Sequence, residues 1–279
     1  MCASLETRIA KLFAEQPQVL AVALGGSRTA GSSPDSASDI DLYVYTKAAV
    51  PLAARHSIVE AAGSASRTSL DLTYWGPGDE WLDASTGIEI DIVYFEAAWM
   101  EGQLNRLVQQ HQPSLGYSTC TWYTLRHSLP LHDPEGWFKK LQTASQIAYP
   151  EPLRRNIITF NHPVLRSIIP SYTAQIEKAL KREDLVSVNH RLANLLASYF
   201  DVLFAINREL HPGEKRLLEL AEARCSRIPV NMALDLKAVL QGAGTAEAQL
   251  LLDLQRLLDH LDDLLAEENI QIPPSPLFH

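Results

Sequence analysis

Two aspartates separated by one residue are the clearest candidates for chemistry in this chain. Asp39 and Asp41 flank Ile40 at the start of an alternating apolar run. On a strand this spacing places both carboxylates on one face. Two neighbouring carboxylates repel each other unless a cation lies between them. Hard oxygen ligands suit Mg²⁺, which usually also takes water and substrate phosphates. The pair therefore predicts a divalent-metal site.

A glycine-serine turn precedes the aspartates. Gly25-Gly26-Ser27 ends an apolar run over residues 18–24, and Gly26 lets the backbone approach a ligand closely. Ser27 is predicted to cap a helix, whose first N–H groups would favour phosphate. Arg28 either adds to a phosphate site or faces water. The turn lacks the spacing of a P-loop or of a dinucleotide-binding fingerprint.

A third acidic position follows on another alternating run. Glu89 and Asp91 share one face of a strand predicted over residues 87–95. Either carboxylate is a candidate general base toward an acceptor hydroxyl, and a third carboxylate would also complete a two-metal site. Turn, paired aspartates and later acid together indicate a site that holds a nucleoside triphosphate through divalent metal.

These residues resemble the nucleotidyltransferase superfamily that includes DNA polymerase β and the antibiotic-modifying nucleotidyltransferases. Gly26, Ser27, Asp39, Asp41 and Asp91 match its pattern in order, within about residues 15–135. The helical second half is similar to the aminoglycoside and lincosamide nucleotidyltransferase group. It looks still more like bacterial relatives of undefined substrate that carry a helical C-terminal domain.

The resemblance implies a fold and a reaction. The fold is α/β (α+β), a small mixed sheet flanked by helices and followed by an all-α bundle. In the reaction an acceptor hydroxyl attacks the nucleotide α-phosphate and pyrophosphate leaves. Asp39 and Asp41 would hold two Mg²⁺ ions, and Ser27 would contact the β- and γ-phosphates. Asp91 would ligate one metal and help to deprotonate the acceptor, with Glu89 as its competitor.

The elements that must position this site follow from periodicity. Strands are predicted over 18–24, 40–45, 70–75 and 87–95, a turn over 76–80, and a loop over 31–38. Helices are predicted over about 1–16, 51–63, 97–112 and 135–147, and residues 129–134 form a strand or a loop. The Pro-rich stretch near 149–152 suggests a nucleotidyltransferase domain over 1–148 and a helical domain over 149–279.

Further charged residues are candidates for ligand contacts. Lys215 lies near a predicted helix start, where a cation is unfavourable unless it meets a phosphate. The resemblance also implies a cation from the helical domain, and the alternative is a solvated lysine. Asp79, Glu80 and Asp83 are candidates for an acidic rim that receives the acceptor.

Charge and cysteine content narrow the partners. Against 24 Lys and Arg the chain has 33 Asp and Glu, a net charge of −9, which argues against nucleic acid as a partner. Scattered cysteines and the lack of a signal or membrane-spanning segment favour a cytoplasmic protein without a membrane partner. The heptad-like leucines from Leu250 to Leu264 form a bundle or a dimer seam, so monomer and homodimer both stay open.

The predicted function is a Mg²⁺-dependent transfer of AMP from ATP to a hydroxyl of a small molecule, antibiotic-like or a metabolite. Gly26, Ser27, Arg28 and Lys215 are its predicted nucleotide contacts. One alternative is an antitoxin-type protein adenylyltransferase. Another is a catalytically inactive nucleotide-binding sensor, against which the complete acidic set argues.

Overall fold

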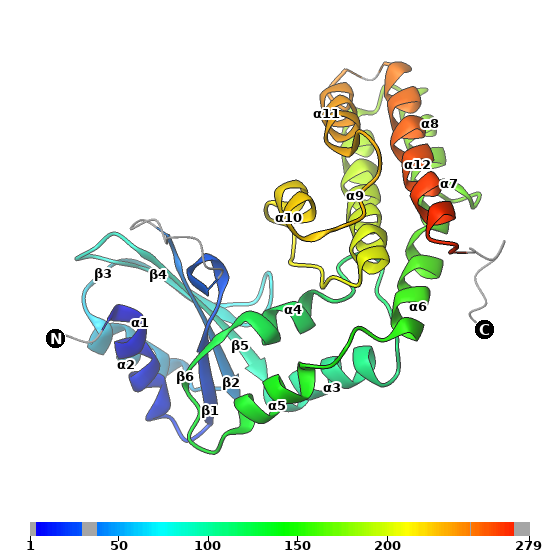
Figure 1. Ribbon diagram of the computed structural model, residues 1–279. Coiled ribbons are helices and arrows are strands. Elements are labelled where there is room, and N and C mark those ends of the chain that lie inside the picture. The colour runs from blue at the N-terminus through cyan, green and yellow to red at the C-terminus, as the bar shows by residue number, and fades with distance from the viewer. Residues whose placement is uncertain (1–3, 30–37, 246, 271–279) are drawn as a thin grey trace. The chain divides into compact units, whose positions relative to one another are not determined.

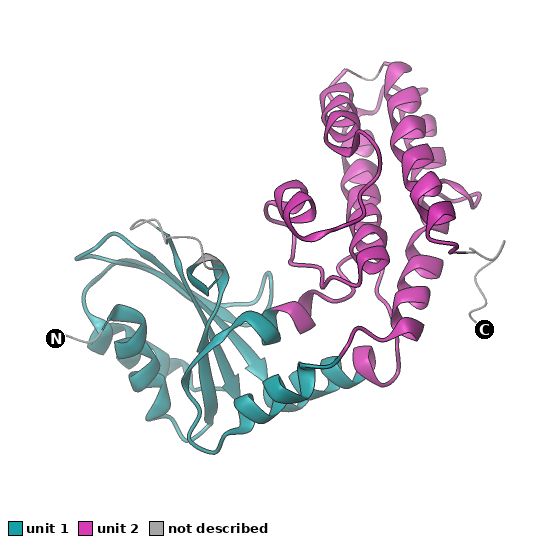
Figure 2. Ribbon diagram, in the orientation of Figure 1, with its two compact units in different colours: residues 1–105, 124–147 teal, residues 106–123, 148–279 magenta. Residues whose placement is uncertain are grey.

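The computed structural model describes residues 4–29, 38–245 and 247–270, and divides into two compact units (Figure 2). The first unit comprises residues 1–105 and 124–147, and the second comprises 106–123 and 148–279. The chain thus enters the second unit at 106–123, returns to the first, and leaves it finally after residue 147. A single boundary at residue 148 does not describe the excursion at 106–123.

A six-stranded mixed sheet forms the centre of the first unit. Its strands are β1 (Val19–Leu24), β2 (Ile40–Thr46), β3 (Ala65–Leu72), β4 (Gly78–Asp83), β5 (Glu89–Glu96) and β6 (Leu129–His132). Their order is β3-β4-β5-β2-β1-β6. The central pair β2 and β5 is parallel, and the other neighbours are antiparallel. The predicted α+β class, with a mixed sheet and a helical region, is confirmed.

Helices α1 (Leu5–Ala14) and α2 (Leu52–Ala62) cover one face of this sheet (Figure 1). The alternation in β2 and β5 directs Leu42, Ile90 and Ile92 onto this face, where they are fully buried. They join Phe13 of α1 and Ile58 of α2 in one hydrophobic cluster. This core fixes the register of both strands, since a slip by one residue would bury their carboxylates.

Aromatic side chains cover part of the other face, near the ends of β2 and β5. Helices α3 (Ala97–Val108) and α5 (Trp137–Ser145) supply Trp99 and Phe138. The Tyr45 and Phe138 rings lie 5.0 Å apart, and Phe95 stacks on Trp99 at 5.5 Å between ring centroids. Asp41 and Asp91 lie toward the beginnings of the same two strands, away from this aromatic cluster.

The second unit is helical. Its helices are α6 (Glu151–Asn161), α7 (Pro163–Arg166), α8 (Tyr172–Leu180), α9 (Leu185–Asn207), α10 (Leu217–Arg224), α11 (Met232–Gly242) and α12 (Gln249–Glu267). Leu250, Leu257 and Leu261 of α12 are fully buried within the chain itself. The leucine stripe is therefore a bundle seam. Among the described helices, none combines the length and apolarity needed to cross a membrane.

Several predicted elements differ from the observed ones. The third strand runs over Ala65–Leu72 rather than 70–75, and β4 occupies much of the predicted turn. The helix predicted to reach residue 112 ends at Val108, and α4 (Cys120–His127) was not predicted. The strand β4 was not predicted, because the charged residues Asp79 and Asp83 occupy two of its inward positions. The loop predicted over 31–38 lies outside the described residues except for Ser38.

Candidate active site

The parallel pairing of β2 and β5 brings two predicted site residues side by side. Asp41 is the register partner of Asp91. Residues directly opposite on adjacent strands direct their side chains to the same face, about 5 Å apart. Both aspartates are half-buried. Two carboxylates this close favour a bound cation or proton between them.

The glycine turn lies directly against the first of these aspartates. The Gly25 N–H donates to the Asp41 carbonyl oxygen at 2.9 Å. Gly26 has a φ of +64°, and a Cβ placed on it would lie only 1.8 Å from Oδ2 of Asp41. A Cβ on Gly25 would similarly meet the Tyr43 ring at 2.1 Å. Both positions therefore require glycine, because Tyr43 and Asp41 pack closely against them. The Gly26 backbone lies directly beside the Asp41 carboxylate.

Ser27 lies within a short 3₁₀ turn over Gly26–Thr29. The structure places Ser27 inside this turn, directly after Gly26, and helix capping by Ser27 stays a prediction. The left-handed conformation of Gly26 starts the turn, and the Thr29 hydroxyl closes it by donating to the Gly26 carbonyl at 3.0 Å. The turn still belongs to the neighbourhood of Asp41, and contact of Ser27 with phosphate stays a prediction.

Arg28 has a structural task that sequence reasoning missed. Its Nε donates to the carbonyl oxygens of Ser38 and Asp39 at 3.1 and 2.9 Å, and its Nη2 also donates to Ser38. The guanidinium thereby fastens the segment that enters β2 to the glycine turn. Asp39, which is exposed, is positioned by this contact. Nothing in the spacing of Arg28 and Asp39 signals it, and a nucleotide contact for Arg28 stays a prediction.

Further carboxylates share this face. Glu80 of β4 is the register partner of Asp91, so Glu80, Asp91 and Asp41 form a row across three adjacent strands. Glu89 lies two residues before Asp91 on the same face and is exposed. The row concentrates negative charge on one half of the sheet face. It attracts cations and cationic ligands.

The other two residues of the predicted acidic rim lie elsewhere. Asp79 and Asp83 are buried on the helix-covered face, which contradicts their assignment to a rim. Asp79 pairs with Arg55 at 2.8 Å. Asp83 accepts hydrogen bonds from Ser85 and Thr86, and the Ser85 contact is the largest cause that lowers its pKa. Their partners come from the chain itself, so their role is structural.

Lys215 belongs to the second unit. It is exposed, in the turn that precedes α10. The next residue, Arg216, pairs with Glu219 and stays within its own helix start. Contact of Lys215 with phosphate therefore remains a prediction.

The fit to magnesium rests on the aspartate pair. Across the described residues, no group of three or more His, Cys, Asp or Glu side chains is spaced to hold a metal ion. Coordination by Asp39, Asp41 and Asp91 together stays a prediction. A pair is compatible with Mg²⁺, which is commonly bound by one or two carboxylates plus water and substrate phosphates.

Comparison with known proteins assigns no function to this chain. A family described as "Domain of unknown function (DUF4037)" matches residues 124–217. No curated protein matches. Among solved structures, a nucleotidyltransferase-like protein from Exiguobacterium sibiricum 255-15 has 11% identity and a TM-score of 0.42, over 94% of this chain and 74% of that one. An aminoglycoside 6-adenyltransferase from Bacillus subtilis has 11% identity and a TM-score of 0.33, over 98% and 94%. Likeness at this level assigns neither a substrate nor a catalytic residue to the chain.

Proposed function

We propose that this protein is a Mg²⁺-dependent nucleotidyltransferase that transfers AMP from ATP to a hydroxyl of a small-molecule acceptor. One observation carries the proposal: Asp41 and Asp91 lie in register on adjacent parallel strands, with the Gly26 backbone against Asp41. Carboxylates aligned beside a backbone without a side chain suit a metal-bound phosphate better than a purely structural role.

In this proposal, different residues of the first unit bind the metal and the phosphates. Asp41 and Asp91 would hold the metal, and the 3₁₀ turn at Gly26–Thr29 would receive the phosphates through its backbone N–H groups. Arg28 holds the main chain at Asp39 to the glycine turn through its hydrogen bond to the Asp39 carbonyl. When bound, Mg²⁺ supplies charge neutralisation at the triphosphate and a lower pKa for the acceptor hydroxyl.

The reaction then follows from positioning. The acceptor oxygen forms a bond to the α-phosphorus, and the bond from this phosphorus to the oxygen that bridges to the β-phosphate breaks. Pyrophosphate leaves with that oxygen, and the hydroxyl proton passes to a carboxylate on the same face. Asp91 and Glu89 are the candidates for this base. Holding both reactants in line supplies much of the rate enhancement.

The acceptor is proposed to be small and to tolerate an acidic surface. Glu80 and Glu89 flank Asp91 on the same face, and the whole chain has a net charge of −9. A cationic acceptor would be attracted to such a face, whereas nucleic acid would be repelled.

Pyrophosphate release in the presence of Mg²⁺ tests the proposal. The wild type is incubated with each nucleoside triphosphate and with pools of aminoglycosides, lincosamides and common metabolites. We expect release with ATP and at least one hydroxylated acceptor, and no release by Asp41→Asn or Asp91→Asn. Glu60→Gln, which removes an exposed carboxylate from α2, is the matched control and should be as active as the wild type. Equal release by all four proteins would refute the proposal.

A further inference from the structure

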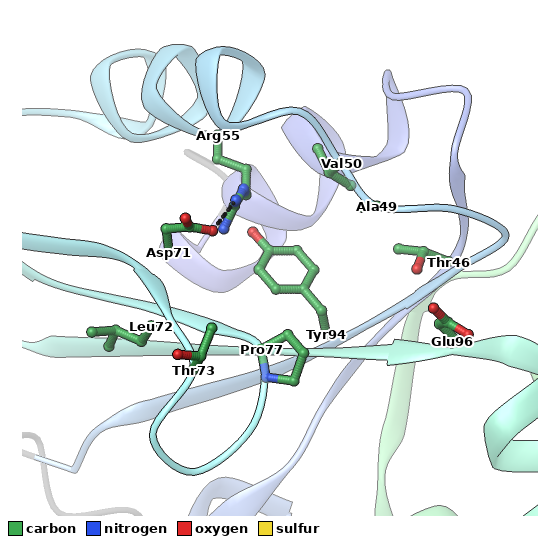
Figure 3. Close-up of a pocket in the computed structure, with 10 residues that line it drawn as sticks. All are labelled: Thr46, Ala49, Val50, Arg55, Asp71, Leu72, Thr73, Pro77, Tyr94 and Glu96. Carbon is green, nitrogen blue, oxygen red and sulfur yellow. Dashed lines mark hydrogen bonds and ion pairs between the residues drawn. The ribbon is translucent and has the colours of Figure 1, made fainter.

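A cavity in the first unit lies at the far ends of β2 and β5, away from Asp41 and Asp91 (Figure 3). Its volume is about 160 Å³. Sites for drug-sized ligands usually enclose roughly 300–1,000 Å³. The cavity therefore suits a small metabolite-sized ligand rather than a nucleotide. Apolar groups of Val50, Leu72, Pro77 and Tyr94 form much of its wall.

A buried ionic network supports one side of this cavity. Asp79 is 1% exposed, and its Oδ1 accepts from Nη1 of Arg55 and from the Asp71 N–H, both at 2.8 Å. Its Oδ2 accepts from the Tyr94 hydroxyl at 2.6 Å. Nη2 of Arg55 donates to Oδ1 of Asp71 at 2.8 Å. Asp79 thus has its hydrogen bonds satisfied by the protein and fixes both Arg55 and Asp71.

Asp71 is held in an uncommon conformation at the cavity wall. Its φ is +61°, at an irregularity in the pairing of β3 with β4. Its side chain is 64% exposed, and only Oδ1 meets Arg55. A non-glycine residue in this region costs on the order of 1 kcal/mol, and such strain concentrates at binding sites. Within the described residues no hydrogen bond engages Oδ2 of Asp71, so this oxygen keeps its acceptor capacity.

Glu96 forms the opposite end of the cavity (Figure 3). It is exposed, and no hydrogen bond or ion pair engages its carboxylate within the described part of the chain. The Tyr94 ring and Pro77 lie between Asp71 and Glu96 (Figure 3). Arg55 contributes one positive charge, and Asp71, Asp79 and Glu96 contribute three negative charges. The site therefore has a net charge of −2, with its two accessible carboxylates at opposite ends of an apolar wall.

From this arrangement we propose that the cavity binds a short aliphatic diamine. One ammonium group would pair with Asp71 and the other with Glu96, and the methylene chain would lie on Tyr94 and Pro77. A dication matches the net charge, and its apolar centre matches the wall between the carboxylates. Arg55 lies at the Asp71 end of the cavity and occupies Oδ1 of that carboxylate, so the ammonium group there would pair with Oδ2. The proposal is independent of the reaction assigned to Asp41 and Asp91.

Titrations followed by NMR test it. Putrescine and cadaverine are added to ¹⁵N-labelled wild type, with butylamine and butanediol as probes that lack one or both charges. We expect the diamines to saturate at millimolar concentration and to shift the amide signals of Thr73 and Glu96. Butylamine should bind several-fold more weakly, and butanediol should not bind. Failure of both diamines to saturate, or binding of butanediol as tight as that of putrescine, would overturn the proposal.

Variants separate the two ends of the site. Asp71→Asn keeps a residue that tolerates positive φ, and Glu96→Gln changes an exposed side chain, so both should fold. Each should weaken diamine binding about threefold to fivefold, the range of exposed ion pairs, and the double variant about tenfold or more. In Glu96→Gln, putrescine should bind no better than butylamine. The control variant Glu15→Gln/Glu60→Gln has the same net charge as the double variant Asp71→Asn/Glu96→Gln, and it should bind the diamines like the wild type. Equal loss in that control would show that bulk charge, not the cavity, attracts the diamine.

Discussion

The two faces of the sheet both present carboxylates, and they use them differently. On the helix-covered face, Asp79 and Asp83 are at most 3% exposed and accept hydrogen bonds from their own chain. On the other face, Asp41 and Asp91 are half-buried and in register, and the Gly26 backbone lies against Asp41. The alternation of side chains along β2, β4 and β5 therefore separates structural acids from candidate catalytic acids. Sequence spacing alone does not distinguish the two uses.

The largest expected effect is on the covered face. Asp79→Ala removes the buried partner of Arg55, whose side chain is 12% exposed, and the hydrogen-bond acceptor of Tyr94. Removing one partner of a buried ion pair costs about 3–5 kcal/mol, so the free energy of unfolding measured in urea should fall by that amount. Glu80→Ala, the next residue but on the other face, should change the free energy of unfolding by less than about 1 kcal/mol. Similar losses for both variants would erase the distinction between the faces.

The next effect is on the candidate site. Gly26→Ala places a methyl group where Oδ2 of Asp41 lies, at a φ that alanine disfavours. Asp41 must move, and a displacement of about 1 Å can cost on the order of a hundredfold in rate. Pyrophosphate release should fall by that factor while the fold persists by circular dichroism. Gly102→Ala is the matched control, because a Cβ at this position meets no atom within 4 Å. Unchanged turnover by Gly26→Ala would separate the turn from the chemistry.

A third prediction uses a buried aspartate of the helical unit. Asp201 accepts hydrogen bonds from the Ser118 N–H at 3.0 Å, the Ser118 hydroxyl at 2.6 Å and Asn161 at 3.1 Å, and no cation of the described residues pairs with it. Burial raises its pKa to about 7, despite the bonds from Ser118. The folded state then binds more protons than the unfolded state between about pH 4 and 7, so this group makes stability fall as pH rises through that range.

The measurement compares the wild type with Asp201→Asn by urea unfolding at pH 5 and at pH 8. The wild type should lose roughly 2.5 kcal/mol relative to the variant over this interval, since about two pH units lie between pH 5 and the folded pKa, at about 1.4 kcal/mol per unit. Above pH 8 the difference should stay constant. A difference that grows in favour of the wild type as pH rises would contradict the assignment. The result sharpens the comparison with Asp79, which pairs with Arg55.

The smallest predicted effect concerns Arg28. Arg28→Gln removes guanidinium bonds to the main chain at Ser38 and Asp39. The variant keeps Asp39, Asp41 and Asp91, and only the segment that leads into β2 loses its hydrogen bonds. Pyrophosphate release should therefore fall about tenfold. Arg155→Gln, which changes a 74% exposed arginine of the helical unit, serves as control and should be fully active. Loss of activity beyond that of Gly26→Ala would show that Arg28 does more than position the chain.

Sequence periodicity predicted the central strands well, because β2 and β5 alternate strongly between Ile or Leu and acidic or aromatic residues. It failed at β4, where Asp79 and Asp83 point inward and resemble a polar turn. The pairing of Asp41 with Asp91 depends on register between strands far apart in the chain, which local pattern does not encode. The hydrogen bonds of Arg28 to the backbone at Ser38 and Asp39 also could not be predicted from the sequence, since any residue at these two positions offers the same backbone carbonyl group.

The most direct test is the magnesium dependence of ATP binding by calorimetry. The wild type, Asp41→Asn and Asp91→Asn are each titrated with ATP in excess Mg²⁺ and again in EDTA. The aligned pair predicts that Mg²⁺ tightens ATP binding to the wild type by at least about tenfold, and that either substitution abolishes this gain. Retention of the full magnesium effect by both variants would contradict the assignment of this face to metal-dependent nucleotidyl transfer.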